Sequence, residues 1–304
     1  MMANRNASSG HKLGQLIGDW YEEYFVLPLL ETVASDLDLY VDSRFRKRSV
    51  RSGKILWEDL DENAVDYDFV LELGGTDDNK GVPVAFIECF WRRGSRHSKD
   101  KARDDSGKLM PMRDTYPTAR FLGIVSAGDF TSPARELVRS RDIDLFYVPK
   151  QKVVDAFLAC GLVMDYPDKL AEDQKSAIVE AFDDAFDETQ KKNVQQNLVA
   201  LIGDAATKSY SNRVSAALSA LPQEIRFIVH HDSQPLTFDT VDAATEFLKD
   251  PSFNMTDPTM SYTYQIEYSD GSEFEKSASD VDELRKLHKQ IAELTAHMNA
   301  IAAT

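Results

Sequence analysis

The chain has 304 residues, of which 42% are hydrophobic and 28% are charged, a composition typical of a globular protein with one large or two moderate domains. No apolar run approaches the ~20 residues that a membrane-spanning helix requires, and the first residues lack the apolar core of a signal peptide. Two cysteines are too few for a disulfide framework. These features argue against membrane and disulfide-rich proteins and predict a cytoplasmic protein.

The net charge of −16 is unevenly distributed. Residues 1–165 contain 23 Lys and Arg against 27 Asp and Glu, whereas residues 166–304 contain 12 against 24. An acidic chain is a poor general binder of nucleic acid, but residues 44–54 and 92–120 form two local basic clusters. Either cluster alone is compatible with an ordinary solvated surface. Because the two flank the acidic strands described below, they predict a contact surface for a polyanion.

In chain order, the first half alternates helical and strand-like segments. Residues 11–34 have the apolar stripe of a helix, with Pro28 as a kink or break. The following pattern predicts strands at 40–49, 54–57, 65–73, 82–91, 119–126 and 144–148, and helices at 97–109, 132–139 and 153–160. This order predicts an α/β fold with a mixed central sheet flanked by helices.

The second half is organised differently. Residues 166–221 are helical and acidic and lie between Pro167 and Pro222. Residues 225–247 and 262–284 each show a strand, a turn, a short strand and a helix, which predicts a small duplicated ββα module. We therefore expect a core at 1–165, a helical connector at 166–222 and an α+β module at 223–304.

The chain ends in a three-heptad apolar seam. Its members are spaced 3-4-3-4-3: Leu284, Leu287, Ile291, Leu294, Met298 and Ile301. Such a seam indicates either a coiled coil with a partner helix or an amphipathic helix that packs on its own domain. We expect the first, and hence a homodimer or larger assembly, or a partner protein, held through this helix, with Ser279 at its N-terminal cap.

Two strand-like segments place a carboxylate among apolar residues: Asp68 in residues 65–72 and Glu88 in residues 83–93. Desolvating an isolated charge is costly unless the charge is paired or bound to a metal. Two carboxylates on neighbouring strands therefore predict a divalent-cation site. The alternative for Asp68 is an ion pair with Arg46 or Arg48.

The arrangement of these residues resembles the PD-(D/E)XK nuclease superfamily over residues ~10–165. Asp68 matches the strand aspartate of the family, and Glu88 matches the glutamate of its E-X-K motif. Glu22 or its neighbour Glu23 matches the carboxylate that the family places on the preceding helix. The pattern departs from the family at Phe90, which stands where the lysine is expected.

Some branches of the family supply this lysine from the helix that follows the strand. Lys99 and Lys101 are the candidates, and we expect Lys101, because His97, Lys101 and Lys108 recur along one helical face. Arg92 is a lesser candidate on the strand face of Glu88, since a guanidinium does not release its proton.

The resemblance implies a restriction-endonuclease-like core that hydrolyses DNA phosphodiester bonds with Mg²⁺ or Mn²⁺ held by Asp68 and Glu88, with a role in bacterial restriction or anti-phage defence. DNA would lie along the basic residues Arg44, Arg46, Lys47, Arg48, Arg92, Arg93, Arg96, His97 and Arg103. A second hypothesis is a catalytically inactive relic that serves as a nucleic-acid-binding or assembly scaffold, because the E-X-K lysine is missing and the chain is acidic.

Overall fold

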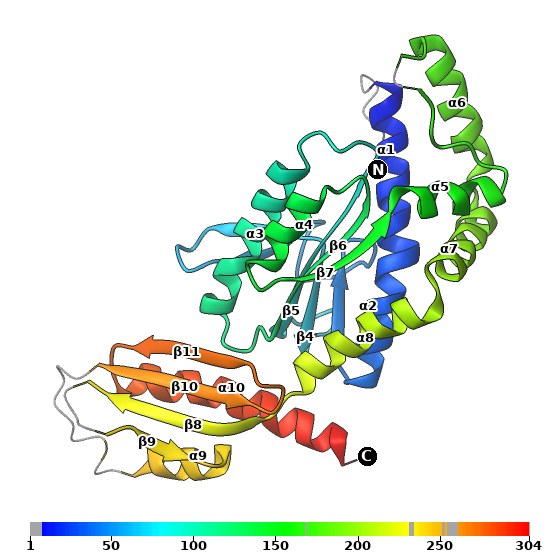
Figure 1. The fold of residues 1–304 in the computed structure, drawn as a ribbon. Helices are drawn as coiled ribbons and strands as arrows, with labels where there is room; N and C mark the ends of the chain where they lie inside the picture. The colour runs from blue at the N-terminus through cyan, green and yellow to red at the C-terminus, as the bar shows by residue number, and fades with distance from the viewer. Residues whose placement is uncertain (1–7, 168, 231–233, 251–252, 254–260, 304) are drawn as a thin grey trace.

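The computed structural model describes residues 8–167, 169–230, 234–250, 253 and 261–303. The fold is mixed α/β, as predicted: a five-stranded mixed sheet lies between layers of helices, and a second, four-stranded sheet with two helices follows (Figure 1). Among the described residues, no helix has the length and apolar character needed to cross a membrane.

The predicted first helix is continuous past Pro28 but changes its winding. It consists of α1 (Ser9–Trp20), a π-helical turn η1 (Tyr21–Val26) and α2 (Leu27–Asp36). Pro28 lies directly after the π-turn, in the first turn of α2, where the helix changes its winding. The wider turn of a π-helix changes which side chains face the sheet, and such turns are frequent at functional sites.

The main sheet has the strand order β1-β4-β5-β6-β7. Its first three strands pair antiparallel and its last three pair parallel. The strands are β1 (Tyr40–Ser43), β4 (Phe69–Leu73), β5 (Val82–Arg92), β6 (Phe121–Gly128) and β7 (Asp144–Pro149).

The single strand predicted at 65–73 is wrong. The chain leaves the strand conformation at Asp68, which separates β3 (Ala64–Tyr67) from β4. β3 pairs with β2 (Ile55–Glu58) in a separate two-stranded sheet, whereas β4 pairs with β1 and β5. Asp68 therefore lies where the chain passes from one sheet to the other.

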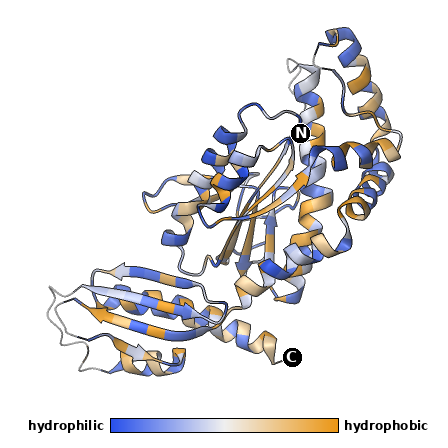
Figure 2. Ribbon diagram, viewed as in Figure 1, coloured by the Kyte–Doolittle hydropathy of each residue, from blue (hydrophilic) through white to orange (hydrophobic). Residues whose placement is uncertain are grey.

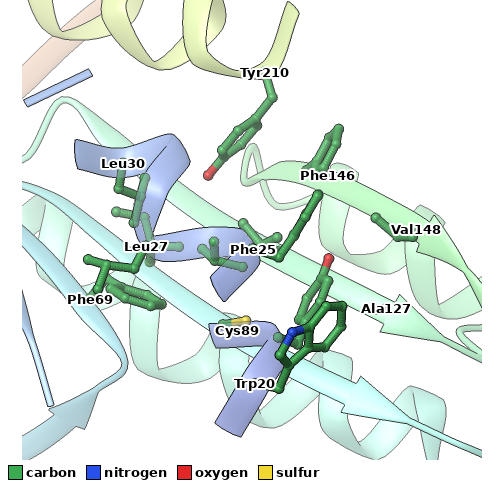
Figure 3. Close-up of a cluster of buried hydrophobic side chains, with 14 of the residues drawn as sticks. Trp20, Phe25, Leu27, Leu30, Phe69, Cys89, Ala127, Phe146, Val148 and Tyr210 are labelled. Atoms are coloured by element: carbon green, nitrogen blue, oxygen red, sulfur yellow. The ribbon is translucent and has the colours of Figure 1, made fainter. Parts of the chain in front are cut away.

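Helices cover both faces of the main sheet (Figure 1). One face carries α3 (Ser98–Thr115) and α4 (Ser132–Arg139). The other carries α1, α2, α5 (Lys150–Ala159) and α8 (Asp204–Ser219), while α6 (Glu172–Ala185) and α7 (Glu188–Ile202) pack on α1 and α5. The helices predicted as a connector thus contribute to the apolar core, where Tyr210 of α8 lies beside Phe146 (Figure 3).

Strand β5 lies at the centre of this core and alternates between its two faces. Ile87 and Cys89 belong to the apolar cluster on the α1 side, and Figure 3 shows the Cys89 sulfur among those side chains. Phe86 and Phe90 belong to the cluster on the α3 side. The core strands are accordingly rich in hydrophobic residues (Figure 2). Glu88 stands between the two phenylalanines, in a row that otherwise packs against α3.

The C-terminal unit contains the two predicted ββα segments in order. They are β8 (Pro222–Val229), β9 (Leu236–Phe238) and α9 (Val241–Lys249), then β10 (Tyr262–Tyr268), β11 (Glu273–Ala278) and α10 (Val281–Ala302). The strands form one antiparallel sheet with the order β11-β10-β8-β9. The unit has an apolar core of its own between this sheet and the two helices.

The chain itself buries the apolar seam of α10, so the prediction that a partner helix covers it is wrong. Leu284, Leu287 and Ile291 lie in the core of the C-terminal unit. Leu294 and Met298 are buried in the α1-side cluster of the main sheet, and Ile301 packs against that cluster. The helix begins after Asp280, rather than Ser279, since the Asp280 carboxylate accepts from the Glu283 N–H at 2.8 Å.

Removal of residues 279–304 is expected to destabilise the protein rather than dissociate a dimer. Five of the seam side chains are buried, and burial stabilises by about 1.5–3 kcal/mol for each side chain, which rivals the ~5–15 kcal/mol of a whole domain. Thermal unfolding followed by circular dichroism will show a lowered midpoint. Light scattering that instead reports a halved mass with an unchanged midpoint would return the seam to a dimer interface.

The C-terminal unit contains a buried histidine whose hydrogen bonds determine which ring nitrogen carries the proton. His288 of α10 lies with Nδ1 2.9 Å from the Tyr264 hydroxyl and Nε2 2.8 Å from the Thr245 hydroxyl. The Thr245 hydroxyl itself donates to the Val241 carbonyl, so it accepts from Nε2, and Nδ1 accepts from Tyr264. Burial lowers the pKa of His288 to about 4, which keeps the ring neutral.

Acid is therefore expected to weaken this unit through His288. The folded-state pKa lies below the ordinary value of about 6.5, so the unfolded chain takes up the proton first as pH falls. The neutral His288 ring contributes on the order of 3 kcal/mol to the free energy of unfolding at pH values above ~6.5, and this contribution is lost as the pH falls to ~4. Denaturant unfolding at several pH values will show this fall in the free energy of unfolding for wild type and not for His288→Gln. Parallel pH profiles would refute it.

Candidate active site

The structure brings Asp68 and Glu88 together. Phe69 of β4 pairs with Ile87 of β5 in antiparallel register, so position 68 stands opposite position 88 where the ladder ends. The Asp68 Oδ2 accepts from the backbone N–H of Cys89 at 2.7 Å. This hydrogen bond holds the Asp68 carboxylate against β5.

Glu88 is an acidic side chain in an interior position. It is 1% exposed, and its Oε2 lies 3.1 Å from the Lys108 ammonium. Its Oε1 is buried and has no hydrogen-bond partner among the described residues. Burial, followed by the negative charges of Asp68 and Asp105, raises the pKa of Glu88 to about 8. A buried carboxylate oxygen without a donor is costly and marks a place for a cation or a proton.

Helix α3 presents two lysines and an aspartate to this carboxylate. The Lys101 Nζ lies 2.7 Å from the Asp105 Oδ1. Asp105 is 1% exposed, and its Oδ2 is buried without a partner in the described structure. Burial opposes the charge on Lys101, but the Asp105 carboxylate outweighs it and raises the Lys101 pKa. Lys101 therefore remains cationic next to the acidic strand positions, and the Lys108 side chain lies beside them in an ion pair with Glu88.

Lys101 also contacts Phe90, the residue at which the sequence departs from the expected motif. Its ammonium lies over the ring of Phe90, 5.3 Å from the ring centroid. The helix thus brings Lys101 to the side chain of the residue at which the sequence departs from the pattern of the resemblance. Lys99 is exposed, with no ion pair or hydrogen bond of its side chain among the described residues. Arg92 is half-buried and donates to the Arg96 carbonyl.

The two helix carboxylates, which the sequence left as alternatives, both lie in the π-turn η1 but have different neighbours. The Glu22 side chain is 12% exposed and accepts from the Arg44 Nε at 2.7 Å. Burial and then the charge of Asp68 raise the pKa of Glu22 to about 8, against the lowering effect of Arg44. Glu23 instead lies near Lys191 and Glu188 of α7. Glu22 therefore joins Asp68, Glu88 and Asp105 in what we call the carboxylate cluster.

The predicted DNA contacts have different environments. Arg48 is buried, and its guanidinium donates to Asp42 at 2.7 Å and to Glu72 at 2.6 and 2.8 Å. A buried guanidinium with these partners cannot reach DNA, so the prediction that Arg48 contacts DNA is wrong. Arg48 instead forms a structural ion pair with Asp42 and Glu72. Arg44 pairs with Glu22 and Asp19.

The remaining predicted contacts are at or near the surface. Arg46 pairs with Glu31, and Arg93 lies over the Tyr166 ring and donates to the Tyr166 carbonyl. His97 lies 3.0 Å from Asp100, which also pairs with Arg103. The exposed members are Lys47, Arg96, His97 and Arg103.

Sequence reasoning missed Asp105 as a site residue and gave Lys108 no role of its own. Both lie on the α3 face of Lys101, because positions 101, 105 and 108 recur at helical spacing. The signal was obscured because Asp105 falls in a stretch of alternating charges that is typical of a solvated helix. Only the burial of Asp105 separates it from Asp104, which is exposed.

The donor set fits a hard cation. Within the described part of the chain, no three or more His, Cys, Asp or Glu side chains are arranged to enclose a metal. Mg²⁺ does not need such a cage, because it keeps several waters and is held by one or two carboxylates together with substrate phosphate oxygens. Asp68 and the unpartnered Oε1 of Glu88 are the carboxylates that would hold such an ion, whereas the cluster has no imidazole or exposed thiolate of the kind that zinc prefers.

Comparison with known proteins gives no match: no protein-family model, no curated protein and no solved structure is significantly similar to this chain.

Proposed function

We propose that this chain is a Mg²⁺-dependent DNA endonuclease whose active site is formed by Asp68, Glu88 and the α3 face that carries Lys101. The observation that carries the proposal is the buried, unpartnered Oε1 of Glu88 opposite Asp68, with two lysines beside it. Clustered ionisable groups with strongly perturbed pKa values are typical of functional sites.

The order of elements supports a restriction-endonuclease-like core. An antiparallel β4–β5 pair carries the two carboxylates, and the parallel strands β6 and β7 follow through α3 and α4 on one face. In this interpretation, Asp68 and Glu88 stand for the acidic residues of the family motif, Glu22 stands for its helix carboxylate, and Lys101 replaces the lysine absent at Phe90.

Each residue has a chemical task in phosphodiester hydrolysis. The reaction forms a bond from a water oxygen to phosphorus and breaks one P–O ester bond. The attacking water gives up a proton to the solvent, and the departing oxygen takes up a proton from the solvent, so that the products are a phosphate monoester and an alcohol. Bound to Asp68 and Glu88, Mg²⁺ would lower the pKa of a water and neutralise phosphate charge. Lys101 stabilises the added charge on the phosphate, and Asp105 holds the Lys101 ammonium in place through its 2.7 Å contact.

A scaffold without catalysis is the second candidate, and one observation favours it. Lys101, Lys108 and Arg44 already supply positive charge to the carboxylates of the cluster. Such pairing lowers the cost of the buried charges without any metal. A scaffold of this kind would bind DNA with a steep salt dependence and would not cut it.

Supercoiled plasmid distinguishes the two candidates. Incubation with Mg²⁺ or Mn²⁺ is expected to produce nicked and linear products, and EDTA is expected to prevent them. The same reaction with Asp68→Ala/Glu88→Ala is the control for a contaminating nuclease. No cleavage by wild type, together with salt-dependent DNA binding, would favour the scaffold. Equal cleavage by wild type and the double variant would exclude this site as the source of the activity. Single-stranded RNA in the same assay tests the choice of DNA.

A further inference from the structure

Lys108 is held loosely beside Glu88, one of the two proposed metal ligands. The Lys108 side chain is 38% exposed, whereas that of Glu88 is 2% exposed. The Lys108 ammonium lies 3.1 Å from the Glu88 Oε2 and 3.3 Å from the Asp66 carbonyl oxygen. Both contacts are longer than the about 2.7–2.9 Å that is typical of charge-assisted hydrogen bonds. The charged end of Lys108 therefore reaches solvent and makes no short contact with either partner.

Lys101, on the same helix, is held differently. Its ammonium lies 2.7 Å from the Oδ1 of Asp105, whose side chain is 1% exposed. Asp105 is not one of the two carboxylates proposed to hold the metal, so Lys101 keeps its partner when an ion is present. Lys108 has to share its partner, because Glu88 supplies both the Oε2 that faces Lys108 and the Oε1 that has no hydrogen-bond partner among the described residues.

The backbone of Lys108 is fixed although its side chain is not. The hydroxyl of the buried Tyr67 donates to the Lys108 carbonyl oxygen at 2.7 Å. This bond ties one turn of α3 to the segment that leads into Asp68. The flexible four-carbon stem of a lysine can turn from such a fixed point without moving the helix. The partly exposed ammonium can therefore turn towards solvent, from which a substrate has to approach.

We propose that Lys108 is a latch, which pairs with Glu88 in the metal-free protein and turns to a DNA phosphate when Glu88 holds a divalent ion. The single charge of Glu88 balances the ammonium alone. With a divalent cation on the same carboxylate, the ammonium faces a larger like charge in a site of low dielectric constant. The proposal rests on the proposed nuclease function and adds a coupling to it. Because linkage is reciprocal, the ion and DNA each raise the affinity for the other.

The first measurement compares duplex DNA binding with and without a divalent ion. Ca²⁺ takes oxygen ligands as Mg²⁺ does, and fluorescence anisotropy of a labelled duplex, shown on a gel to be intact, gives the affinity of the full chain. In EDTA, Lys108→Met is expected to bind DNA like wild type, because Glu88 already engages the lysine. In Ca²⁺, the variant is expected to bind at least ~5-fold more weakly, as for loss of a charged hydrogen bond. Lys208→Met removes an exposed lysine of α8 and is expected to match wild type in both buffers.

The second measurement detects release of Lys108 without DNA. Lysines are acetylated with a water-soluble succinimidyl ester, and peptide mass spectrometry gives the rate at each position. Lys108 of wild type is expected to react several-fold faster in Ca²⁺ than in EDTA, whereas the rates of Lys101 and Lys208 stay unchanged. In Glu88→Gln, Lys108 is expected to react fast in both buffers, because the neutral amide does not hold the ammonium.

The outcomes separate this proposal from the nuclease function. Two results would overturn the latch alone: the same effect of Lys108→Met on DNA binding in EDTA and in Ca²⁺, or an unchanged Lys108 acetylation rate in a wild type that binds Ca²⁺ in calorimetry. A wild type that binds no divalent ion in calorimetry would overturn the latch and the proposed metal site together.

Discussion

Glu88→Gln will reduce metal-dependent DNA cleavage by at least ~10³-fold. The substitution keeps the size of the side chain but removes the charge opposite Asp68, and charge stabilisation by a bound metal is worth several kcal/mol at ~1.4 kcal/mol for each factor of ten. Initial rates of plasmid nicking at saturating Mg²⁺ measure the effect. Asp68→Asn should give a loss of the same order, because both carboxylates would hold the same ion.

Glu23→Gln is the matched control for Glu88→Gln. Glu23 is a glutamate one residue from Glu22 but outside the carboxylate cluster, so its variant is expected to cut like wild type. The folded state of Glu88→Gln should be at least as stable as wild type in EDTA, because the neutral amide replaces a carboxyl group whose ionisation the buried site disfavours, as its raised pKa shows. Unimpaired cleavage by Glu88→Gln would rule out Glu88 as a metal ligand.

Lys101→Ala will lower the cleavage rate by at least ~10²-fold while DNA affinity stays within a few fold, which is the pattern of a group that acts mainly in the transition state. The reason is the position of its ammonium over Phe90 and beside Asp105. Single-turnover cleavage and a DNA-binding titration separate the two quantities.

Lys99→Ala serves as the control, since Lys99 is an exposed lysine on the same helix. Normal cleavage by Lys101→Ala with a loss in Lys108→Ala would assign the role to Lys108, which lies 3.1 Å from Glu88. Normal cleavage by both variants would contradict a lysine supplied by α3.

Much of the fold follows from hydrophobic patterning. The apolar run of residues 82–91 predicted a strand, and the structure has β5 there, with Ile87 and Phe86 in opposite clusters. The helices α3 and α4 were predicted near their observed positions for the same reason. The break at Asp68 was not predicted, because periodicity continues through it and only the pairing of β3 with β2 reveals it. Pairing between distant segments is not encoded in local pattern.

The α10 seam shows a second limit of pattern. A heptad repeat and a helix that spans two apolar cores have the same spacing, so the sequence left both interpretations open. The structure divides the seam, with Leu287 in the C-terminal unit and Met298 against the main sheet. The choice depends on the position of the two units, which local spacing does not specify.

The candidate site was predictable in part. The sequence placed Asp68 and Glu88 on neighbouring strands, and the antiparallel register of β4 and β5 sets the two positions opposite each other. Glu22 was not separable from Glu23, because the direction of each side chain depends on the π-turn. Arg48 resembled its basic neighbours in sequence, and only its buried contacts with Asp42 and Glu72 distinguish it.

Titration of Mn²⁺ into the metal-free protein, followed by calorimetry, tests most directly whether the carboxylate cluster holds a divalent cation. Wild type and Glu23→Gln are expected to bind Mn²⁺ saturably with the same affinity, and Asp68→Asn/Glu88→Gln is expected to show no binding in the same range. The titration is repeated with duplex DNA present. Equal Mn²⁺ binding by the double variant, or no Mn²⁺ binding by wild type even with duplex DNA, would contradict a divalent-cation site in the carboxylate cluster.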